Sequence, residues 1–346
     1  MARYTISWFT ILLLSITTPS LALTFKSETY RDSEATKITF KSNYGLNLFG
    51  DIGDPIEAHG YLWMPKKIQK NSKVPLIVLM PGMGGMKGRD NRMCRTMAEA
   101  GIACFGTRIY ASRGYLDKNL PGREAIMKAG LASRLADAYA ALAALSTIPE
   151  IDVENAWLGG WSAGGMAARL ATSVGASKPF MKSQQDFRGF LSMYAYCISP
   201  INTAHKSVPF RAFWGEADYV FDKKKCDTMI NEMQGDGVIA TSHLFEGNVG
   251  HWWDNMWFEE SKKGWVKTKS RWKSGGPDVY ACEGVYDYSK NKITFTGGEI
   301  ESFGDMVTWE NALDACGIKM GTNAANAKAT KIVDEQIIEM ITGKTK

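Results

Sequence analysis

The first part of the chain after an apolar leader carries short runs in which apolar and polar residues alternate. Residues 36–42 and 58–64 alternate in this way, with turn residues at 43–45 and 51–55 between them, so we predict an antiparallel pair of strands. Residues 74–80 (VPLIVLM) are instead almost continuously apolar, which is typical of a strand buried on both faces. The first two strands therefore lead into a buried sheet.

Helical and strand periodicities then alternate along the chain. We predict helices at residues 91–100 and 123–145, with Pro149 ending the second, and a strand at 102–107 between them. Further strands are predicted at 190–196, 210–215 and 238–245, and further helices at 223–233 and 323–341. Such alternation is typical of an α/β fold with a mostly parallel central sheet and helices on both faces.

One stretch breaks this alternation. Residues 252–315 carry a cluster of five tryptophans, at positions 252, 253, 257, 265 and 272, a sixth at position 309, and a two-strand pattern at 286–295. We interpret this stretch as an insertion into a single domain that covers residues 23–346, because no repeat and no low-complexity linker divides the chain.

The composition is that of an ordinary globular protein. Of 346 residues, 45% are hydrophobic and 22% are charged, and 41 basic side chains against 36 acidic ones leave a net charge of only +5. So small an excess gives no reason to expect a nucleic-acid partner or an acidic membrane surface. The oligomeric state does not follow from the sequence.

Residues 1–22 have the features of a cleaved secretory signal peptide. Arg3 supplies a cationic start, residues 6–16 are mostly apolar, and small residues follow Pro19. A membrane anchor is the alternative, but hydroxyl side chains interrupt the roughly 20 apolar residues that a span requires. We therefore expect a secreted or periplasmic protein without a stable membrane anchor.

The chain has six cysteines, and an even number in an exported protein favours disulfides. No C-x-x-C pair or cysteine–histidine cluster occurs in the sequence, which argues against structural zinc, and we expect no metal. The sequence alone leaves the connectivity open. Pairing of nearest neighbours joins Cys94 with Cys104, Cys197 with Cys226, and Cys282 with Cys316.

Residues 160–164 (GWSAG) form a G-x-S-x-G motif between an apolar run that includes 156–158 and a helix-prone stretch at 166–172. In this context the motif predicts a sharp strand-to-helix turn that presents Ser162 as a nucleophile. Gly160 and Gly164 leave the room that such a turn needs. An ordinary glycine-rich turn is the alternative, so the interpretation depends on finding partners for the serine.

A serine nucleophile requires a base, and only four histidines are present. We select His251, which follows the last predicted strand, because ligands of such folds gather at the carboxyl ends of parallel strands. Asp218, in the loop after residues 210–215, is our candidate for the acid that orients the histidine, and Glu216 is its rival. The alternative role for Asp218 is to cap the helix predicted near Asp222.

Acyl transfer also requires N–H donors for the oxyanion of the transition state. Ala163, directly after the nucleophile, can supply one, and the glycine-rich loop after residues 74–80 can supply the other, from Met83. Candidates for substrate contact lie after the strand at 102–107, where two arginines can reach a carboxylate, and beside the serine and the histidine. They are Arg108, Tyr110, Arg113, Trp161 and Trp252.

These features together resemble the α/β-hydrolase superfamily and, more narrowly, its dienelactone hydrolase-like branch, from about residue 36 to the C-terminus. The most specific pieces are RLAD at 134–137 leading to Ile151-Asp152, GWSAGG at 160–165, GEAD at 215–218 and Gly250-His251. The resemblance implies an α/β-hydrolase fold, triad residues in the order serine, aspartate, histidine, and no cofactor. Cys197 and Cys226 also resemble a pair found in secreted relatives.

The chain departs from dienelactone hydrolase itself in two ways. That enzyme has a cysteine nucleophile and a glutamate near the oxyanion loop, whereas this chain has Ser162 and no carboxylate in residues 81–85. The resemblance therefore does not imply activity on dienelactone. The aromatic insertion is also longer than the stretch that such enzymes usually have before the closing helix.

The resulting hypothesis is a secreted serine hydrolase that cleaves small carboxylic esters through an acyl-enzyme intermediate. We expect short acyl chains, because indoles around His251 would narrow the entrance to the site. Two alternatives remain. A peptidase would use the same triad but usually carries an additional large domain, and a non-catalytic binding protein would keep the fold and use the aromatic insertion to hold a ligand.

Overall fold

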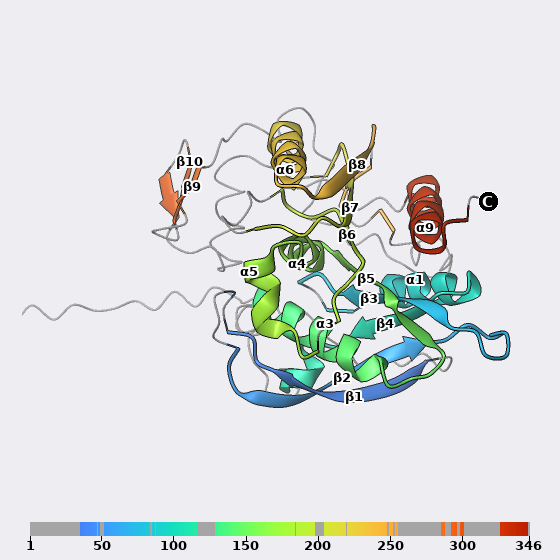
Figure 1. Cartoon of the computed structure of the whole chain (residues 1–346). Helices are drawn as coiled ribbons and strands as arrows, with labels where there is room; N and C mark the ends of the chain where they lie inside the picture. Colours follow the sequence, from blue (N-terminus) through green and yellow to red (C-terminus); the bar gives the residue numbers. More distant parts are fainter. Residues whose placement is uncertain are drawn as a thin grey trace, which may run out of the picture.

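The structure is a computed structural model of the whole chain, drawn in Figure 1. The residues that it describes are 35–46, 48, 52–83, 85–86, 88–115, 129–183, 185–197, 204–218, 220–247, 249–251, 253–254, 285–287, 292–295, 298–300 and 326–344. The predicted signal peptide, Trp252, Cys282 and Cys316 lie outside these residues.

The centre of the molecule is an eight-stranded sheet with the strand order β1-β2-β4-β3-β5-β6-β7-β8. Its strands are β1 (Thr36–Asn43), β2 (Pro55–Trp63), β3 (Val74–Met80), β4 (Ala103–Thr107), β5 (Ile151–Trp161), β6 (Gly189–Met193), β7 (Pro209–Gly215) and β8 (Ile239–Phe245). β2 pairs antiparallel with β1 and with β4, and all other pairs in this sheet are parallel. The predicted antiparallel lead-in and the mostly parallel sheet are therefore confirmed.

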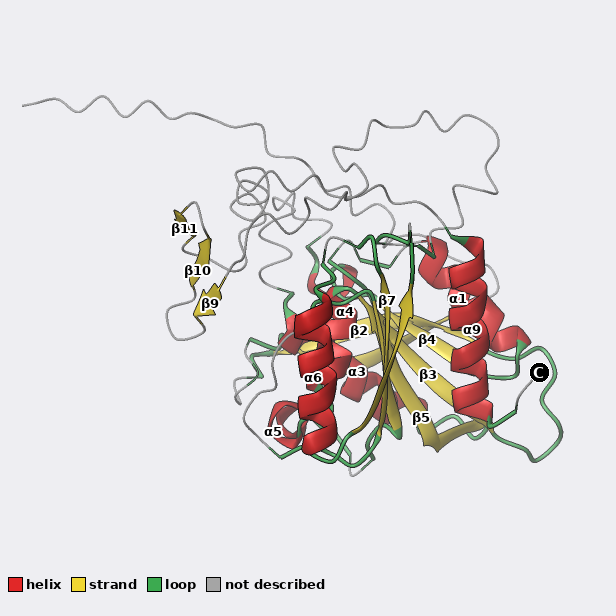
Figure 2. Ribbon diagram, turned by 90° about the horizontal axis from the view of Figure 1, so that it is seen from above, coloured by secondary structure: helices red, strands yellow, loops and turns green. Residues whose placement is uncertain are grey.

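Helices cover both faces of this sheet, as Figure 2 shows. The helices are α1 (Gly88–Glu99), α3 (Leu131–Leu145), α4 (Ala163–Leu170), α5 (Val174–Ser177), α6 (Lys223–Gly235) and α9 (Ala327–Thr342), with short 3-10 turns η2 (Ala111–Arg113) and η3 (Lys178–Phe180). α1 and α9 pack on one face, and α3, α4 and α6 pack on the other. This arrangement confirms the α/β-hydrolase fold that the sequence predicts.

Strand β3 shows why a continuous apolar run marks the middle of the sheet. Ile77 and Leu79 belong to the core under α1 and α9, whereas Leu76 and Val78 belong to the core under α3 and α4. All four side chains are 0% exposed. Burying each such side chain stabilises the fold by about 1.5–3 kcal/mol. β3 therefore packs firmly against both helical layers, which holds the strand end, where the candidate oxyanion loop begins, in place.

Two predicted elements differ from the observed ones. The helix predicted at 123–145 is observed from Leu131, because Gly130 adopts an extended conformation, and residues 123–128 of the prediction lie outside the described residues. The strand predicted to reach residue 196 ends at Met193, because Tyr194 has a φ of 39° and leaves the extended region. Both differences lie beside the site described below.

The predicted insertion is described only in part. Three strands, β9 (Val285–Asp287), β10 (Lys292–Phe295) and β11 (Gly298–Ile300), form a small antiparallel sheet. This sheet confirms the predicted two-strand pattern and adds a third strand. No helix in the described ranges is both long enough and apolar enough to cross a bilayer.

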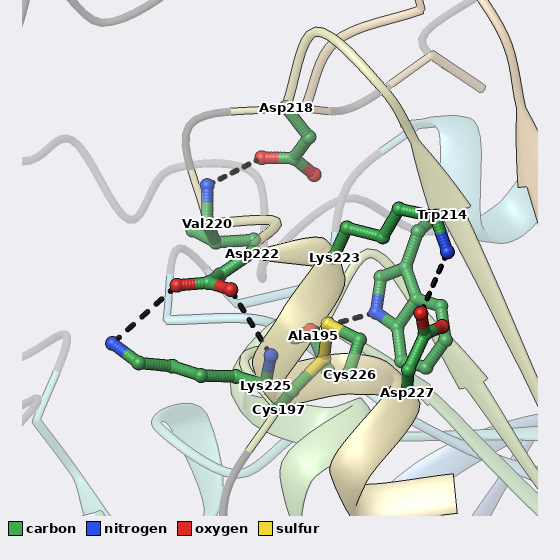
Figure 3. Close-up of a disulfide and its surroundings, with 10 residues drawn as sticks. All are labelled: Ala195, Cys197, Trp214, Asp218, Val220, Asp222, Lys223, Lys225, Cys226 and Asp227. Carbon is green, nitrogen blue, oxygen red and sulfur yellow. Dashed lines mark hydrogen bonds and ion pairs between the residues drawn. A yellow bond between two sulfur atoms is a disulfide. The ribbon is translucent and has the colours of Figure 1, made fainter. Parts of the chain in front are cut away.

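Two of the three predicted disulfides are observed. Cys94–Cys104 joins α1 to β4, and Cys197–Cys226 joins the segment after β6 to α6 (Figure 3). The third predicted pair lies outside the described residues. Closing loops of 10 and 29 residues contributes about 3 and about 3.5 kcal/mol respectively through the entropy of the unfolded chain. These bonds are compatible with an extracellular location.

Candidate active site

Ser162 lies at the turn between β5 and α4. Its backbone has a φ of 50° and a ψ of −115°, and the residue is 8% exposed. Its N–H donates to the carbonyl of Met193 at 2.9 Å, and its own carbonyl accepts from the N–H of Met166 at 2.9 Å. These bonds hold a conformation that costs a non-glycine residue about 1–3 kcal/mol, and such strain concentrates at functional sites.

Two glycines make this turn possible, as the motif predicts. A Cβ atom on Gly160 would lie 2.4 Å from the carbonyl carbon of Gly164, and one on Gly164 would lie 2.2 Å from the carbonyl oxygen of Met80. Both distances are far inside van der Waals contact, so any larger residue would push the elements apart. Because α4 can start against the end of β3, Ser162 sits at the carboxyl edge of the sheet.

Asp218 and His251 come from the loops that follow β7 and β8. Nδ1 of the imidazole lies 3.0 and 2.9 Å from the two carboxylate oxygens, and both residues are almost fully buried. A carboxylate only accepts, so Nδ1 carries the hydrogen and Nε2 is left as the basic nitrogen. The loops also touch through their backbones, since the N–H of Ala217 donates to the carbonyl of Val249 at 3.1 Å.

The other acidic residues near this loop have different partners. Asp222, rather than Asp218, caps α6 by accepting from the N–H of Lys225 at 3.0 Å (Figure 3). Glu216 accepts from the N–H of Gly247 at 2.6 Å. The structure therefore brings Asp218 to the histidine and leaves its rival at the surface.

The remaining histidines are engaged elsewhere. His59 on β2 contacts Ser112, His205 contacts Asp236, and His243 on β8 contacts Gln336. Burial lowers the pKa of His205 and of His243, so both imidazoles favour the neutral form. Of the four histidines, His251 is the one that bonds Asp218.

Tyr194 links the serine and the histidine, and sequence reasoning missed it. It directly follows Met193, which binds the backbone of Ser162. Its ring lies 4.7 Å from the imidazole of His251, centre to centre, and its hydroxyl donates to Oδ1 of Asp254 at 3.0 Å. Tyr194 and Ser162 are two of the three non-glycine residues with positive φ in the described part of the chain. This backbone strain, which the sequence does not reveal, is the structural signal that identifies Tyr194.

The histidine loop is also tied to the C-terminal helix. The indole of Trp253 is 0% exposed and packs 4.7 Å from the ring of Tyr194. The backbone carbonyl of Trp253 accepts from the N–H of Asn326 at 2.7 Å and from the hydroxyl of Thr330 at 3.2 Å. These bonds fix Trp253, close to His251 in the sequence, to the start of α9, which follows the predicted insertion along the chain.

The candidate oxyanion loop follows β3 and lies against the nucleophile. A Cβ atom on Gly82 would lie 3.3 Å from the carbonyl oxygen of Trp161 and 3.5 Å from Cβ of Ser162. The next residue, Met83, is half-buried. Ala163 is the first residue of α4, where the helix itself makes no use of the N–H group. Gly82, the residue before the predicted donor Met83, therefore lies against Ser162, and the other predicted donor, Ala163, directly follows the serine.

Buried side chains hold this loop from behind. The guanidinium of Arg134 on α3 donates to the carbonyls of Pro81 and Gly82, each at 3.0 Å. The hydroxyl of Tyr110 donates to the carbonyl of Met83 at 2.7 Å. Tyr110 was predicted to contact substrate, but it is 0% exposed and serves the loop instead. The sequence indicates Arg134 only as part of the RLAD motif at 134–137 and predicts no role for its side chain.

The two arginines predicted to bind substrate are also buried. Arg113 forms an ion pair with Asp137 at 2.8 Å, and both side chains are 0% exposed. Arg108 is 0% exposed, donates to Asn91 at 3.2 Å and lies 4.8 Å from the centre of the Tyr61 ring. The prediction that these arginines reach a substrate carboxylate is therefore corrected, because both cations are buried and have partners in the interior.

Trp161 and Trp252 were both predicted to contact substrate, and the structure corrects this prediction for Trp161. Trp161 is 0% exposed and belongs to the core under α1 and α9, so it does not face a substrate. Trp253 is equally buried. Alternation along β5 explains the first case, since side chains of successive residues point to opposite faces and Trp161 points away from the turn. Trp252 lies outside the described residues.

The described residues contain no group of three or more His, Cys, Asp or Glu side chains that is arranged to hold a metal ion. A buried carboxylate–imidazole pair and a strained serine are groups that acyl transfer by a serine hydrolase requires.

Two solved structures of hydrolases are among those to which this chain is similar. Esterase 2 of Thermogutta terrifontis, phosphorylated by paraoxon, is 16% identical, with 67% of this chain and 92% of that chain covered and a TM-score of 0.47. The dienelactone hydrolase-like promiscuous phosphotriesterase P91 from metagenomic libraries is 14% identical, with 84% and 100% covered and a TM-score of 0.47. Likenesses of this degree do not specify a substrate.

Comparison with curated proteins finds no match for this sequence. The model of the dienelactone hydrolase family, in contrast, matches residues 58–258. That range covers more than half of the 346 residues and runs from β2 past His251. It includes the turn at Ser162, the loop that carries Asp218 and the candidate oxyanion loop. The chain therefore belongs to the dienelactone hydrolase family and is a hydrolase.

Proposed function

We propose that this hydrolase cleaves carboxylic esters of small molecules with a serine triad. Ser162 is the nucleophile, His251 is the general base, and Asp218 holds the imidazole in the tautomer that the reaction needs. The N–H groups of Met83 and Ala163 bind the oxyanion.

The reaction proceeds in two stages. Oγ of Ser162 attacks the ester carbonyl carbon while Nε2 of His251 takes the hydroxyl proton. The tetrahedral intermediate then collapses, and the alcohol leaves with the proton that His251 returns. A water molecule deprotonated by His251 attacks the acyl-enzyme, which releases the carboxylic acid and restores Ser162.

One observation carries the proposal, namely the buried hydrogen bond between Asp218 and His251 at the same carboxyl edge of the sheet as the strained Ser162. Burying a carboxylate–imidazole pair has a desolvation cost that an apolar pair of similar volume would avoid. A strained serine likewise costs stability. Both costs fall at one edge of the sheet, and they are explained together if the three side chains form a catalytic unit.

Kinetics of variants test this unit. With p-nitrophenyl acetate as substrate, we expect Ser162→Ala and His251→Ala each to lower kcat by roughly 10⁴-fold or more. The double variant should be no slower than either single variant, because groups that act as a unit are not additive. Glu216→Gln is the matched control and should retain wild-type kcat. Turnover that survives Ser162→Ala would contradict the proposal.

We also propose a short acyl chain and export from the cell. The preference for short chains rests on the indoles that surround His251 in the sequence, with Trp253 no longer among them. A panel of chromogenic esters with short, long and aromatic acyl groups tests it, and comparable or faster turnover of long chains would contradict it. Sequencing the N-terminus of the mature protein tests export, which predicts a start just after Ala22.

A further inference from the structure

Three consecutive carbonyl groups in the candidate oxyanion loop point at the same two buried side chains. Nε of Arg134 donates to Pro81, and Nη2 donates to Gly82, each at 3.0 Å. The carbonyl of Met83 accepts from the Tyr110 hydroxyl at 2.7 Å, and that hydroxyl accepts from Nη2 of Arg134 at 3.4 Å. One side of the loop backbone is therefore committed to Arg134 and Tyr110.

The geometry of the peptide bond converts this into a direction for the N–H groups. In a planar trans peptide the C=O and the N–H of the next residue point in opposite directions. The carbonyl of Gly82 points at Arg134, so the N–H of Met83 points away from it. A Cβ atom placed on Gly82 would lie 3.5 Å from Cβ of Ser162, so the nucleophile lies beside this peptide.

The charge of Arg134 has a further consequence for that peptide. The residue is 2% exposed, and all five of its N–H donors are used on the carbonyls of residues 81, 82, 129 and 130 and on the Tyr110 hydroxyl. None of the described carboxylates pairs with it, whereas the neighbouring Arg113 is neutralised by Asp137. A cation that polarises the Gly82 carbonyl makes the Met83 N–H of the same peptide a stronger donor.

We propose that Arg134 is a positioning residue for the oxyanion hole: it fixes the direction of the Met83 N–H and strengthens it as a donor to the transition state. This inference rests on the proposed esterase function. It assigns to α3 a role in catalysis without contact with substrate. Because the effect acts on charge that develops only in the transition state, it should appear in kcat and not in KM.

Variants of Arg134 test the proposal on the full chain with a short p-nitrophenyl ester, after titration of the active sites. Losing one oxyanion donor costs about 10²- to 10³-fold, and misdirecting one should cost part of that, so we expect Arg134→Met to lower kcat about 10- to 100-fold. KM should stay within about threefold. Arg134→Lys keeps the charge but not the five directed donors, and should fall between Arg134→Met and wild type.

Two further measurements separate positioning from a merely structural role. Affinity for a trifluoromethyl ketone, which forms a tetrahedral adduct with the serine, should fall in parallel with kcat/KM. Arg211→Met is the matched control, because Arg211 is a half-buried arginine on β7 whose side chain contacts Thr241 and the Phe213 ring. It should leave kcat and ketone affinity at wild-type values.

The outcomes are distinct. Unchanged kcat in folded Arg134→Met, a rise in KM alone, or a loss that disappears after active-site titration each overturns the inference. If Arg134→Met does not fold, Arg134→Lys is judged by the same three criteria. A wild-type protein that does not hydrolyse esters overturns the proposed function instead, and the inference falls with it.

Discussion

The two halves of the candidate site are built by different means. In the histidine half, Asp218 and His251 bond each other directly through their side chains, and Tyr194 supports the imidazole. In the oxyanion half, the expected donors are backbone N–H groups, and the side chains of Arg134 and Tyr110 act only by holding carbonyls. The first half depends on residue identity at the reacting atoms, and the second depends on the direction of a backbone.

This difference predicts how each half fails. Replacing a side chain in the histidine half removes a reacting group or its tautomer, so activity should fall by orders of magnitude. Replacing a supporting side chain in the oxyanion half leaves the N–H groups in place but less well directed, so the loss should be smaller and confined to kcat. The following variants break or sharpen the comparison, beginning with the largest expected effect.

Asp218→Asn should produce a loss in the histidine half that approaches the loss expected for His251→Ala. An amide can donate to Nδ1, which favours the wrong tautomer of His251, and the expected fall in kcat is about 10⁴-fold, or about 5.5 kcal/mol. Steady-state kinetics on a short ester measure it. A fall of less than tenfold would mean that Asp218 does not orient the base.

The histidine half was largely predictable from the sequence because its residues follow strand ends with clear patterns. The apolar run at residues 74–80 predicted where β3 begins and ends, because a strand buried on both faces contains no polar residues. Ser162, Asp218 and His251 follow β5, β7 and β8, so the order of strands alone put them at one edge. Register and packing were not needed for that step.

The supporting residues were not predictable, because their roles arise only in three dimensions. Arg134 lies on a helix that is buried on nearly all sides, so the sequence offers no polar face from which to single it out. The loop after β4 folds inward, which buried Arg108, Tyr110 and Arg113 against our expectation. Tyr194 continues an apolar run, and nothing local in the sequence signals that its φ turns positive.

The two disulfides give a second test of the comparison. Removing Cys197–Cys226 should cost about 3.5 kcal/mol of unfolding free energy and also lower kcat, because that bond flanks the loop that carries Asp218. Removing Cys94–Cys104 should cost about 3 kcal/mol without a change in kcat, because Arg134 and Tyr110 hold the oxyanion loop independently.

Paired Cys→Ala variants, studied by chemical denaturation and by kinetics at a temperature where both are folded, separate these effects. Equal losses of kcat in both double variants would contradict the assignment of Cys197–Cys226 to the histidine half. A loss of kcat in the Cys94/Cys104 variant alone would show that the oxyanion loop depends on α1 instead.

Tyr194→Phe should have the smallest effect. The variant keeps the ring against His251 and removes only the hydroxyl that bonds Asp254, so we expect a loss of about 1 kcal/mol in stability and a nearly unchanged kcat. Tyr194→Ala is the informative partner, because it removes the ring itself and should lower kcat about tenfold or more. Similar kcat values for the two variants would mean that the ring does not support the imidazole.

The central claim is that Ser162 is activated by His251, and labelling with a fluorophosphonate tests it most directly. Mass mapping of the folded protein should find one adduct, on the peptide that contains Ser162, and the adduct should be absent in Ser162→Ala and strongly slowed in His251→Ala. A correctly folded protein that takes no label, or that carries the label on a different residue, would contradict the account and favour a binding protein that has kept the fold.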